Sequence, residues 1–197
     1  MAENSRPLIR LATNAEDAAS GLLVYRDGLP FYATRITAII TELYAVSAVL
    51  RELDNAQIDP GHRPGWYRIE NDVDLIVLSV QYTLEDVFGM FRRARGRSQK
   101  MVWDDLEHRM SQDETVDFLE RLSWYRAFLE DTFAILEGHE SEDLGLLRRR
   151  IDVLLDTQEM SHRSGIRERT ERITERCKKV PRPYRLVSSI YISEHNS

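Results

Sequence analysis

The sequence predicts an all-α protein: an antiparallel helical bundle of about five helices with a basic C-terminal appendage. Three observations support this prediction. Apolar residues recur every three or four positions over long stretches, as they do along one face of an α-helix. Only nine glycines and six prolines interrupt 197 residues, of which 42 % are apolar, so long helices can enclose a core. The one strand-like segment, residues 184–192, has no second strand with which to pair.

The first two helices are expected in the N-terminal third of the chain. Residues 1–13 read as a loose leader, and Asn14, a residue type favoured at N-caps, would begin a short helix that ends near Arg26. A second, longer helix should run from Phe31 to about Asn55, because its apolar seam alternates spacings of three and four. That seam consists of Ile36, Ile39, Leu43, Val46, Leu50 and Leu53. Residues 58–65 hold two prolines and two glycines and predict a loop.

The pattern of residues in the middle of the chain predicts three helices, the first of which should be the central helix of the bundle. Residues 68–95 show an apolar surface broad enough to touch more than one other helix. A short helix should cover 101–110. Ser111 followed by Glu114 forms a capping-box pattern, which predicts the start of the next helix, and Gly138 fits its end.

The last helix raises a question that the sequence leaves open. Its apolar stripe consists of Leu144, Leu147, Ile151 and Leu154, and it fails where Gln158 takes the next apolar position. The helix therefore either leaves the core and projects, or stops near Met160 and restarts. We interpret residues 14–160 as the helical bundle domain and residues 161–197 as a basic C-terminal helix or tail.

Charge is distributed unevenly along the chain. The net charge is −6, yet residues 163–197 hold nine basic and four acidic residues, and the rest of the chain is acidic. A basic tail on an acidic body is typical of contact with an anionic membrane, nucleic acid or an acidic protein surface, or else of a solvated helix that balances the charge of the body. The expected partner-binding residues are Arg163, Arg167, Arg169, Arg172, Arg176, Lys178 and Lys179. A second basic cluster suits contact with an anionic surface; it consists of Arg92, Arg93, Arg95, Arg97 and Lys100.

No motif in the sequence indicates an enzyme. Neither a P-loop nor a dinucleotide-binding glycine pattern occurs, and we expect no cofactor, no small-molecule substrate and no specific nucleic-acid binding. Glu159 and His162 have the spacing seen in di-iron bundles, but such sites need two of these motifs and further carboxylates, so no metal site is expected. Cys177 lies among basic residues that would favour its thiolate, yet no base accompanies it.

The same features suggest where the protein resides. A single cysteine cannot form an internal disulfide, so nothing points to an oxidising compartment. The N-terminus lacks the apolar stretch of a secretory signal, and no run of about 18 apolar residues predicts a membrane-spanning helix. We therefore expect a cytoplasmic protein.

Residues 31–160 resemble a known helical family. The run at 79–93, then Trp103 with Leu106, and the Leu-x-x-Tyr-Arg-x-Phe-Leu element at 122–129 are similar to the HeLo-like helical N-terminal domains of fungal NLR-like (STAND) proteins and related short fungal proteins. The resemblance implies an all-helical signalling or interaction module. Members active in cell death begin with an apolar helix rich in small residues, whereas residues 1–20 here are polar.

These observations lead to two functional hypotheses. The first is a non-enzymatic module that associates with itself or with a protein partner, with segment 158–179 facing the partner, because this segment is helix-compatible but poor in apolar residues. Deleting residues 163–197 should then leave a folded protein that no longer binds its partner. The alternative is a peripheral, membrane-associated cell-death effector or regulator, which should float with anionic liposomes at low salt.

Overall fold

The fold was analysed in a computed structural model, which describes residues 6–94, 96–110, 116–139 and 143–179, and their side chains except those of 109, 110 and 164–179. The residues described are mostly helical and include no strand, which confirms the all-α prediction. The chain divides into two compact units, Met1–Ser161 and His162–Ser197. In order, the described helices are α1 (Pro7–Gly28), the 3-10 turn η1 (Pro30–Tyr32), α2 (Ala33–Ile58), α3 (Arg63–Trp66), α4 (Glu70–Arg93), α5 (Gln99–Met110), α6 (Phe118–Leu136) and α7 (Leu144–Lys179).

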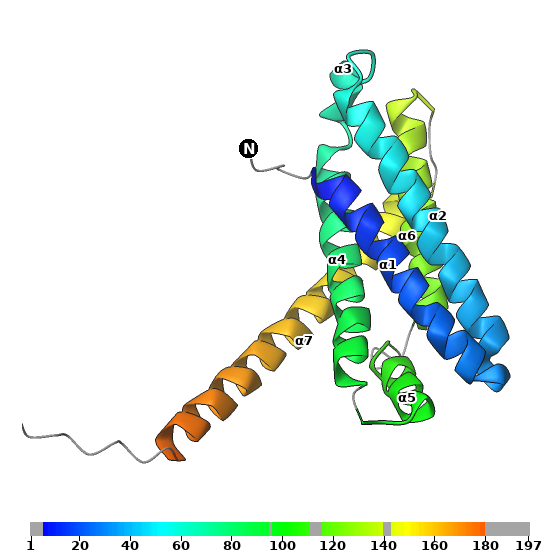
Figure 1. The fold of residues 1–197 in the computed structure, drawn as a ribbon. Coiled ribbons are helices and arrows are strands. Elements are labelled where there is room, and N and C mark those ends of the chain that lie inside the picture. Colours follow the sequence, from blue (N-terminus) through cyan, green and yellow to red (C-terminus); the bar gives the residue numbers. More distant parts are fainter. Residues whose placement is uncertain (1–5, 95, 111–115, 140–142, 180–197) are drawn as a thin grey trace, which may run out of the picture. The chain divides into compact units, whose positions relative to one another are not determined.

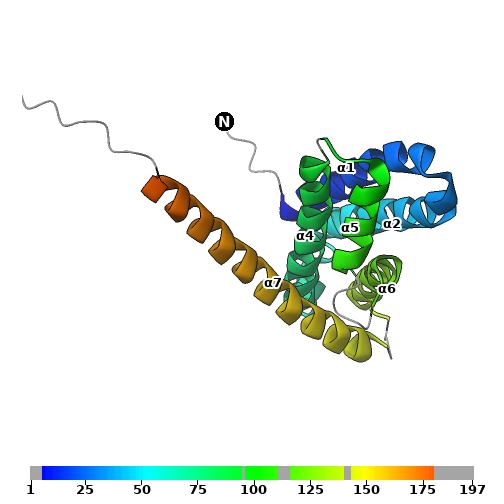
Figure 2. The ribbon, with the colours of Figure 1, turned by 90° about the horizontal axis from the view of Figure 1, so that it is seen from below.

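Helices α1 and α2 form an antiparallel hairpin at one side of the first unit, joined by η1 (Figure 1). Helices α4 and α6 pack against this hairpin, and α5 closes one end beside α4 (Figure 2). The largest side chains that are fully buried come from α5 and α6: they are Trp103, Phe118, Tyr125 and Phe128. The core therefore lies where the hairpin meets α4, α5, α6 and the first part of α7, and each of these aromatic rings buries a large apolar surface in it.

Helix α1 begins seven residues earlier than the sequence suggested, so the expected leader over residues 7–13 is wrong. Pro7 occupies the first turn of the helix, where its missing N–H and fixed φ suit helix initiation. Leu8 and Leu11 are buried against the core. These apolar contacts stabilise helical turns before Asn14. Asn14 therefore lies inside the helix and does not cap its start.

The α6 boundaries show one correction and one confirmation. The side chain of Asp117 caps α6 by accepting a hydrogen bond from the backbone N–H of Glu120 at 2.9 Å, whereas the expected cap, Ser111, lies outside the described residues. Gly138 has a φ of +92°, a conformation that glycine adopts without strain, and it follows α6 as predicted. The predicted loop 58–65 also overlaps an unexpected turn of helix, α3, which ends at Trp66.

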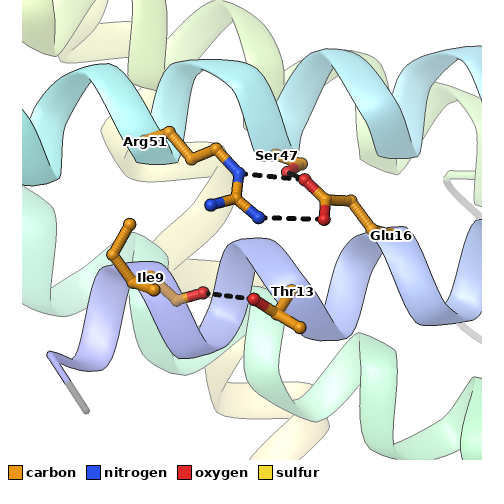
Figure 3. A network of polar contacts seen from close by, with 5 residues as sticks. All are labelled: Ile9, Thr13, Glu16, Ser47 and Arg51. Carbon is orange, nitrogen blue, oxygen red and sulfur yellow. Dashed lines mark hydrogen bonds and ion pairs between the residues drawn. The ribbon is translucent and has the colours of Figure 1, made fainter.

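A charged seam joins α1 to α2 (Figure 3). Arg51 donates from Nε and Nη2 to the two carboxylate oxygens of Glu16, each at 2.9 Å, and Ser47 donates to the same carboxylate at 2.6 Å. The side chains of Glu16 and Arg51 remain 35 % and 40 % exposed. We refer to Glu16, Ser47 and Arg51 as the charged seam.

One segment of the bundle is long and apolar enough to cross a membrane by length and composition alone, although the sequence predicted no membrane-spanning helix. This segment, Pro30–Ile58, comprises η1 and α2. Within the first unit its apolar seam is buried in the core, where Ile36, Leu43 and Leu50 are at most 1 % exposed. The core helix of a soluble bundle meets the same criterion, so the segment is weak evidence for a membrane span.

Helix α7 continues past the point where its apolar stripe fails. It is continuous from Leu144 to Lys179, so a break near Met160 is wrong. Gln158 is only 4 % exposed, and it therefore belongs to the core although it interrupts the apolar stripe. The first unit includes α7 up to Ser161, where Leu147, Ile151 and their neighbours pack into the core.

Candidate protein-interaction surface

The outer side of α7 carries three exposed apolar side chains in a line. Leu146 is 44 % exposed, Val153 is 67 % exposed and Met160 is 63 % exposed. They are seven residues apart, close to two helical turns, so they lie on nearly the same side of the helix. The core-facing side of α7 is a different one, because Leu147, Ile151 and the rest of the buried stripe are offset from this line. We call Leu146, Val153 and Met160 the outer stripe.

A groove lies beside the outer stripe, between α7 and the start of α6. Its volume is about 500 Å³, and Trp124 of α6 forms part of its wall. Most of its lining surface is apolar, which is typical of sites that bind apolar side chains. The residues that line it are Val116, Trp124, Arg149, Arg150, Val153, Leu154 and Thr157.

Three consecutive arginines on α7 have different roles. Arg148 is bound to Asp72 of α4 through two contacts of 2.6 Å, from Nε to Oδ1 and from Nη2 to Oδ2. This bidentate pairing with Asp72 raises the pKa of Arg148 and ties α7 to α4. Arg150 instead places its guanidinium 5.0 Å from the ring centre of Trp124, within the range of a cation–π contact. Arg149 and Arg150 are exposed at the groove and give it a positive rim.

A buried polar network holds α7 against α4 and α6 beneath this surface. The Tyr125 hydroxyl of α6 lies 2.9 Å from the Ser79 hydroxyl and 2.8 Å from that of Thr83, both on α4. Gln158 of α7 accepts from Ser79 at 2.7 Å and donates to Thr83 at 2.8 Å. All four side chains are at most 4 % exposed. We call Ser79, Thr83, Tyr125 and Gln158 the neutral network.

The neutral network contains no charged group. Burial raises the pKa of Tyr125 above its ordinary value, so the hydroxyl stays protonated at neutral pH. A protonated hydroxyl can both donate and accept, and the Gln158 amide supplies one acceptor and two donors. The sequence offered one signal that was missed: Ser79 and Thr83 are one helical turn apart within the apolar surface of the central helix, which calls for a buried polar partner.

The basic residues predicted to bind partners are only partly described. Arg163 is exposed, whereas the side chains of Arg167, Arg169, Arg172, Arg176, Lys178 and Lys179 lie outside the described residues. In the other basic cluster, Arg92 and Arg93 are exposed on α4, and Arg95 is outside the described residues.

The last two members of that cluster have acidic partners nearby. Arg97 contacts Asp105 at 2.6 Å and Lys100 contacts Asp104 at 2.7 Å. Hydrogen bonding to these carboxylates raises the pKa of both cations. Part of the positive charge expected at an anionic surface is therefore balanced within the protein itself.

Among the described side chains, no group of three or more His, Cys, Asp or Glu residues is arranged to hold a metal ion. Glu159 and His162, the pair with di-iron spacing, are partly exposed on α7. Cys177 belongs to α7, but its side chain lies outside the described residues. No protein-family model, curated protein or solved structure matches the chain.

Proposed function

We propose that the protein is a non-enzymatic interaction module whose docking surface is the outer stripe of α7 with the adjoining groove. Its ligand is an amphipathic helix that presents apolar residues to the stripe and acidic residues to Arg149 and Arg150. On this proposal, α1, α2, α4, α6 and the first part of α7 form a five-helix bundle that displays the surface. The basic residues of 161–197 form an appendage that extends the contact with an acidic partner.

One observation carries the proposal: Val153 stands two-thirds exposed beside an apolar groove, on a helix whose opposite side is fully buried. Exposed apolar residues that occur singly are common on protein surfaces, but a line of them beside a groove marks an interaction site. An amphipathic helix contacts such a surface through residues spaced three, four and seven apart. The outer stripe repeats every seven residues, which is one of these spacings, and therefore suits a helical ligand.

The resemblance to HeLo-like helical domains agrees with this proposal, since those domains act as signalling and interaction modules. The neutral network adds a physical reason for the bundle to serve as a rigid platform. It fixes α7 to α4 and α6 through buried hydrogen bonds, so the groove keeps its shape when no ligand is bound. Binding to a preformed groove costs less conformational entropy than binding to a groove that must become ordered around the ligand.

Site-specific photo-crosslinking in the native cell tests the proposal. A photoreactive residue at Leu146 should form a discrete adduct, and Val153→Asp in the same chain should abolish it. The matched control places the photoreactive residue at Val24, which is 61 % exposed on α1. The proposal fails if Leu146 and Val24 give the same adducts, or if Val153→Asp leaves the Leu146 adduct unchanged.

A further inference from the structure

The outer stripe is its own complement, and we infer that the chain forms a two-fold symmetric dimer in which the α7 helices of two copies pack antiparallel about Val153. This inference rests on the proposed function, since it names the occupant of the same surface. Two-fold dimers are the commonest protein assemblies, and in them one surface patch must match itself. The residues around Val153 satisfy this requirement in both apolar contact and charge.

The apolar match follows from the spacing of the outer stripe. Leu146 precedes Val153 by seven residues and Met160 follows it by seven. In an antiparallel pair centred on Val153, the two Val153 side chains meet at the axis. Leu146 of each copy then faces Met160 of the other, and the flexible methionine can adapt to the space beside it. All three exposed apolar residues are covered by this one arrangement.

The charge match is independent of the apolar one. Arg149 precedes Val153 by four residues and Asp156 follows it by three, so the helical repeat places both on the same flank of the stripe. In an antiparallel two-fold pair, equal flanks of the two helices meet. Arg149 of each copy therefore faces Asp156 of the other, and the contact forms twice by symmetry. Both side chains are exposed in the single chain and so are available for this pairing.

The alternative orientation places like charges together. In a parallel pair, opposite flanks of the two helices meet at the same level, which brings Arg149 of one copy to Arg150 of the other. Like charges that face each other across an interface disfavour association. The charges therefore favour the antiparallel orientation, as charged residues beside the apolar seam do in coiled coils.

The groove adds a second contact to the pair. It opens beside Val153, and Trp124 and Val116 form its apolar wall. An α7 helix lying across Val153 also covers this wall and displaces water from it. A contact built mainly from one helix per copy belongs to the small, reversible class of interfaces. We therefore expect dissociation constants between about 1 µM and 1 mM.

Sedimentation equilibrium of the full chain, with a charge exchange at Arg149 and Asp156, tests the inference. Wild type should shift from monomer to dimer across the concentration range above. Arg149→Asp places two acidic side chains opposite each other at both contacts, and Asp156→Arg places two arginines there. Each variant alone should associate at least about tenfold more weakly than wild type. Circular dichroism melting confirms that both variants, changed only at exposed positions, remain folded.

An equimolar mixture of the two variants provides the decisive measurement. In the mixed dimer, the Arg149→Asp chain carries aspartate at both positions of the contact, and the Asp156→Arg chain carries arginine at both. Each contact then joins an aspartate to an arginine, so both become attractive again. The mixture should associate within about threefold of wild type. A mixture no tighter than the separate variants overturns the antiparallel register, and a wild type that is monomeric at every concentration overturns self-association.

This outcome can be told apart from failure of the proposed function. If wild type is monomeric while the Leu146 crosslink to another protein forms and is lost on Val153→Asp, the surface binds a different partner and only the dimer is wrong. If the Leu146 crosslink joins two copies of the chain, mass spectrometry should place its far end near Met160. A crosslink between the copies that maps elsewhere contradicts the proposed register.

Discussion

The charged seam between α1 and α2 and the neutral network among α4, α6 and α7 both join helices through polar side chains, but with opposite chemistry. The seam uses a carboxylate and a guanidinium that remain more than one-third exposed. The network uses hydroxyls and an amide that are almost wholly excluded from water. Exposed charges keep part of their hydration, so their pairing contributes little, whereas buried neutral groups depend on one another for their hydrogen bonds.

This difference indicates where substitutions should destabilise the bundle most. Burying a charge requires costly dehydration unless the charge is paired. The network around Gln158 therefore uses neutral groups, and the buried Asp72 is paired with Arg148 of α7. Loss of one network member leaves the others buried with fewer partners. Within the seam, loss of Glu16 or Arg51 leaves the other charged group accessible to water.

Gln158→Ala should have the largest effect, because Gln158 contacts Ser79, Thr83 and Tyr125 at once. The truncation leaves a cavity and removes hydrogen bonds from buried groups. We expect the free energy of unfolding to fall by about 2–4 kcal/mol. Urea denaturation followed by circular dichroism measures this change.

The matched control is Gln81→Ala on α4, since Gln81 is exposed and donates to Glu85 within its own helix at 3.0 Å. Its effect should stay within about 0.5 kcal/mol. Equal losses at Gln81 and Gln158 would mean that burial of the network does not determine its contribution.

Tyr125→Phe should lower the free energy of unfolding by an intermediate amount, and this difference from wild type should change at alkaline pH. The variant keeps the buried ring and removes only the hydroxyl, so we expect a loss of about 1–2 kcal/mol at neutral pH. Burial raises the pKa of folded Tyr125 above the 10.0 of an unfolded tyrosine. The stability that the hydroxyl provides is therefore fully present below pH 10, and it should be lost as the pH rises through the folded-state pKa.

Denaturant unfolding of wild type and Tyr125→Phe from neutral pH to above pH 10 checks this behaviour. Tyr67→Phe is the control, because Tyr67 is 73 % exposed and its removal should leave both the stability and its pH dependence nearly unchanged. A difference between wild type and Tyr125→Phe that stays constant above pH 10 would contradict the expected pKa direction.

The sequence predicted the helices far better than the polar contacts between them. Apolar periodicity depends only on local spacing, and it located α2 and α4 to within a few residues of their ends. Gln158 was misread because its burial depends on Ser79 and Tyr125, which are 79 and 33 residues away. Asn14 was misread for a related reason: the helix before it is stabilised by core contacts made by Leu8 and Leu11.

The candidate surface was predicted less well than the fold. In the sequence, segment 158–179 stood out because it is poor in apolar residues, and its basic residues from Arg163 onward stood out by their charge. The structure draws attention to Leu146 and Val153, which lie among buried leucines and look like core residues in the sequence. Only the orientation of α7, set by the neutral network and by the pairing of Arg148 with Asp72, shows that they face outward. Such an orientation is a property of packing, which no local pattern records.

Glu16→Gln should have the smallest effect on the free energy of unfolding. Its difference from wild type should disappear as the pH falls, whereas that of Tyr125→Phe should disappear as the pH rises. Hydrogen bonds from Arg51 and then from Ser47 lower the pKa of Glu16 below its usual 4.5. The stability that the carboxylate provides is thus present above pH 4.5 and lost as the pH falls through the folded-state pKa. Because the pair is partly exposed and screened by water, we expect only about 0.3–1 kcal/mol at neutral pH.

Unfolding measured in parallel at neutral pH, below pH 4.5 and in added salt makes this last comparison complete. The advantage of wild type over Glu16→Gln should shrink in acid, and salt should weaken it because exposed charges are screened. Glu52→Gln serves as the control, as Glu52 is exposed on the same helix as Arg51. An advantage that persists in acid and in salt would mean that the seam acts through shape and neutral hydrogen bonding, and the two polar contacts would then share one chemistry.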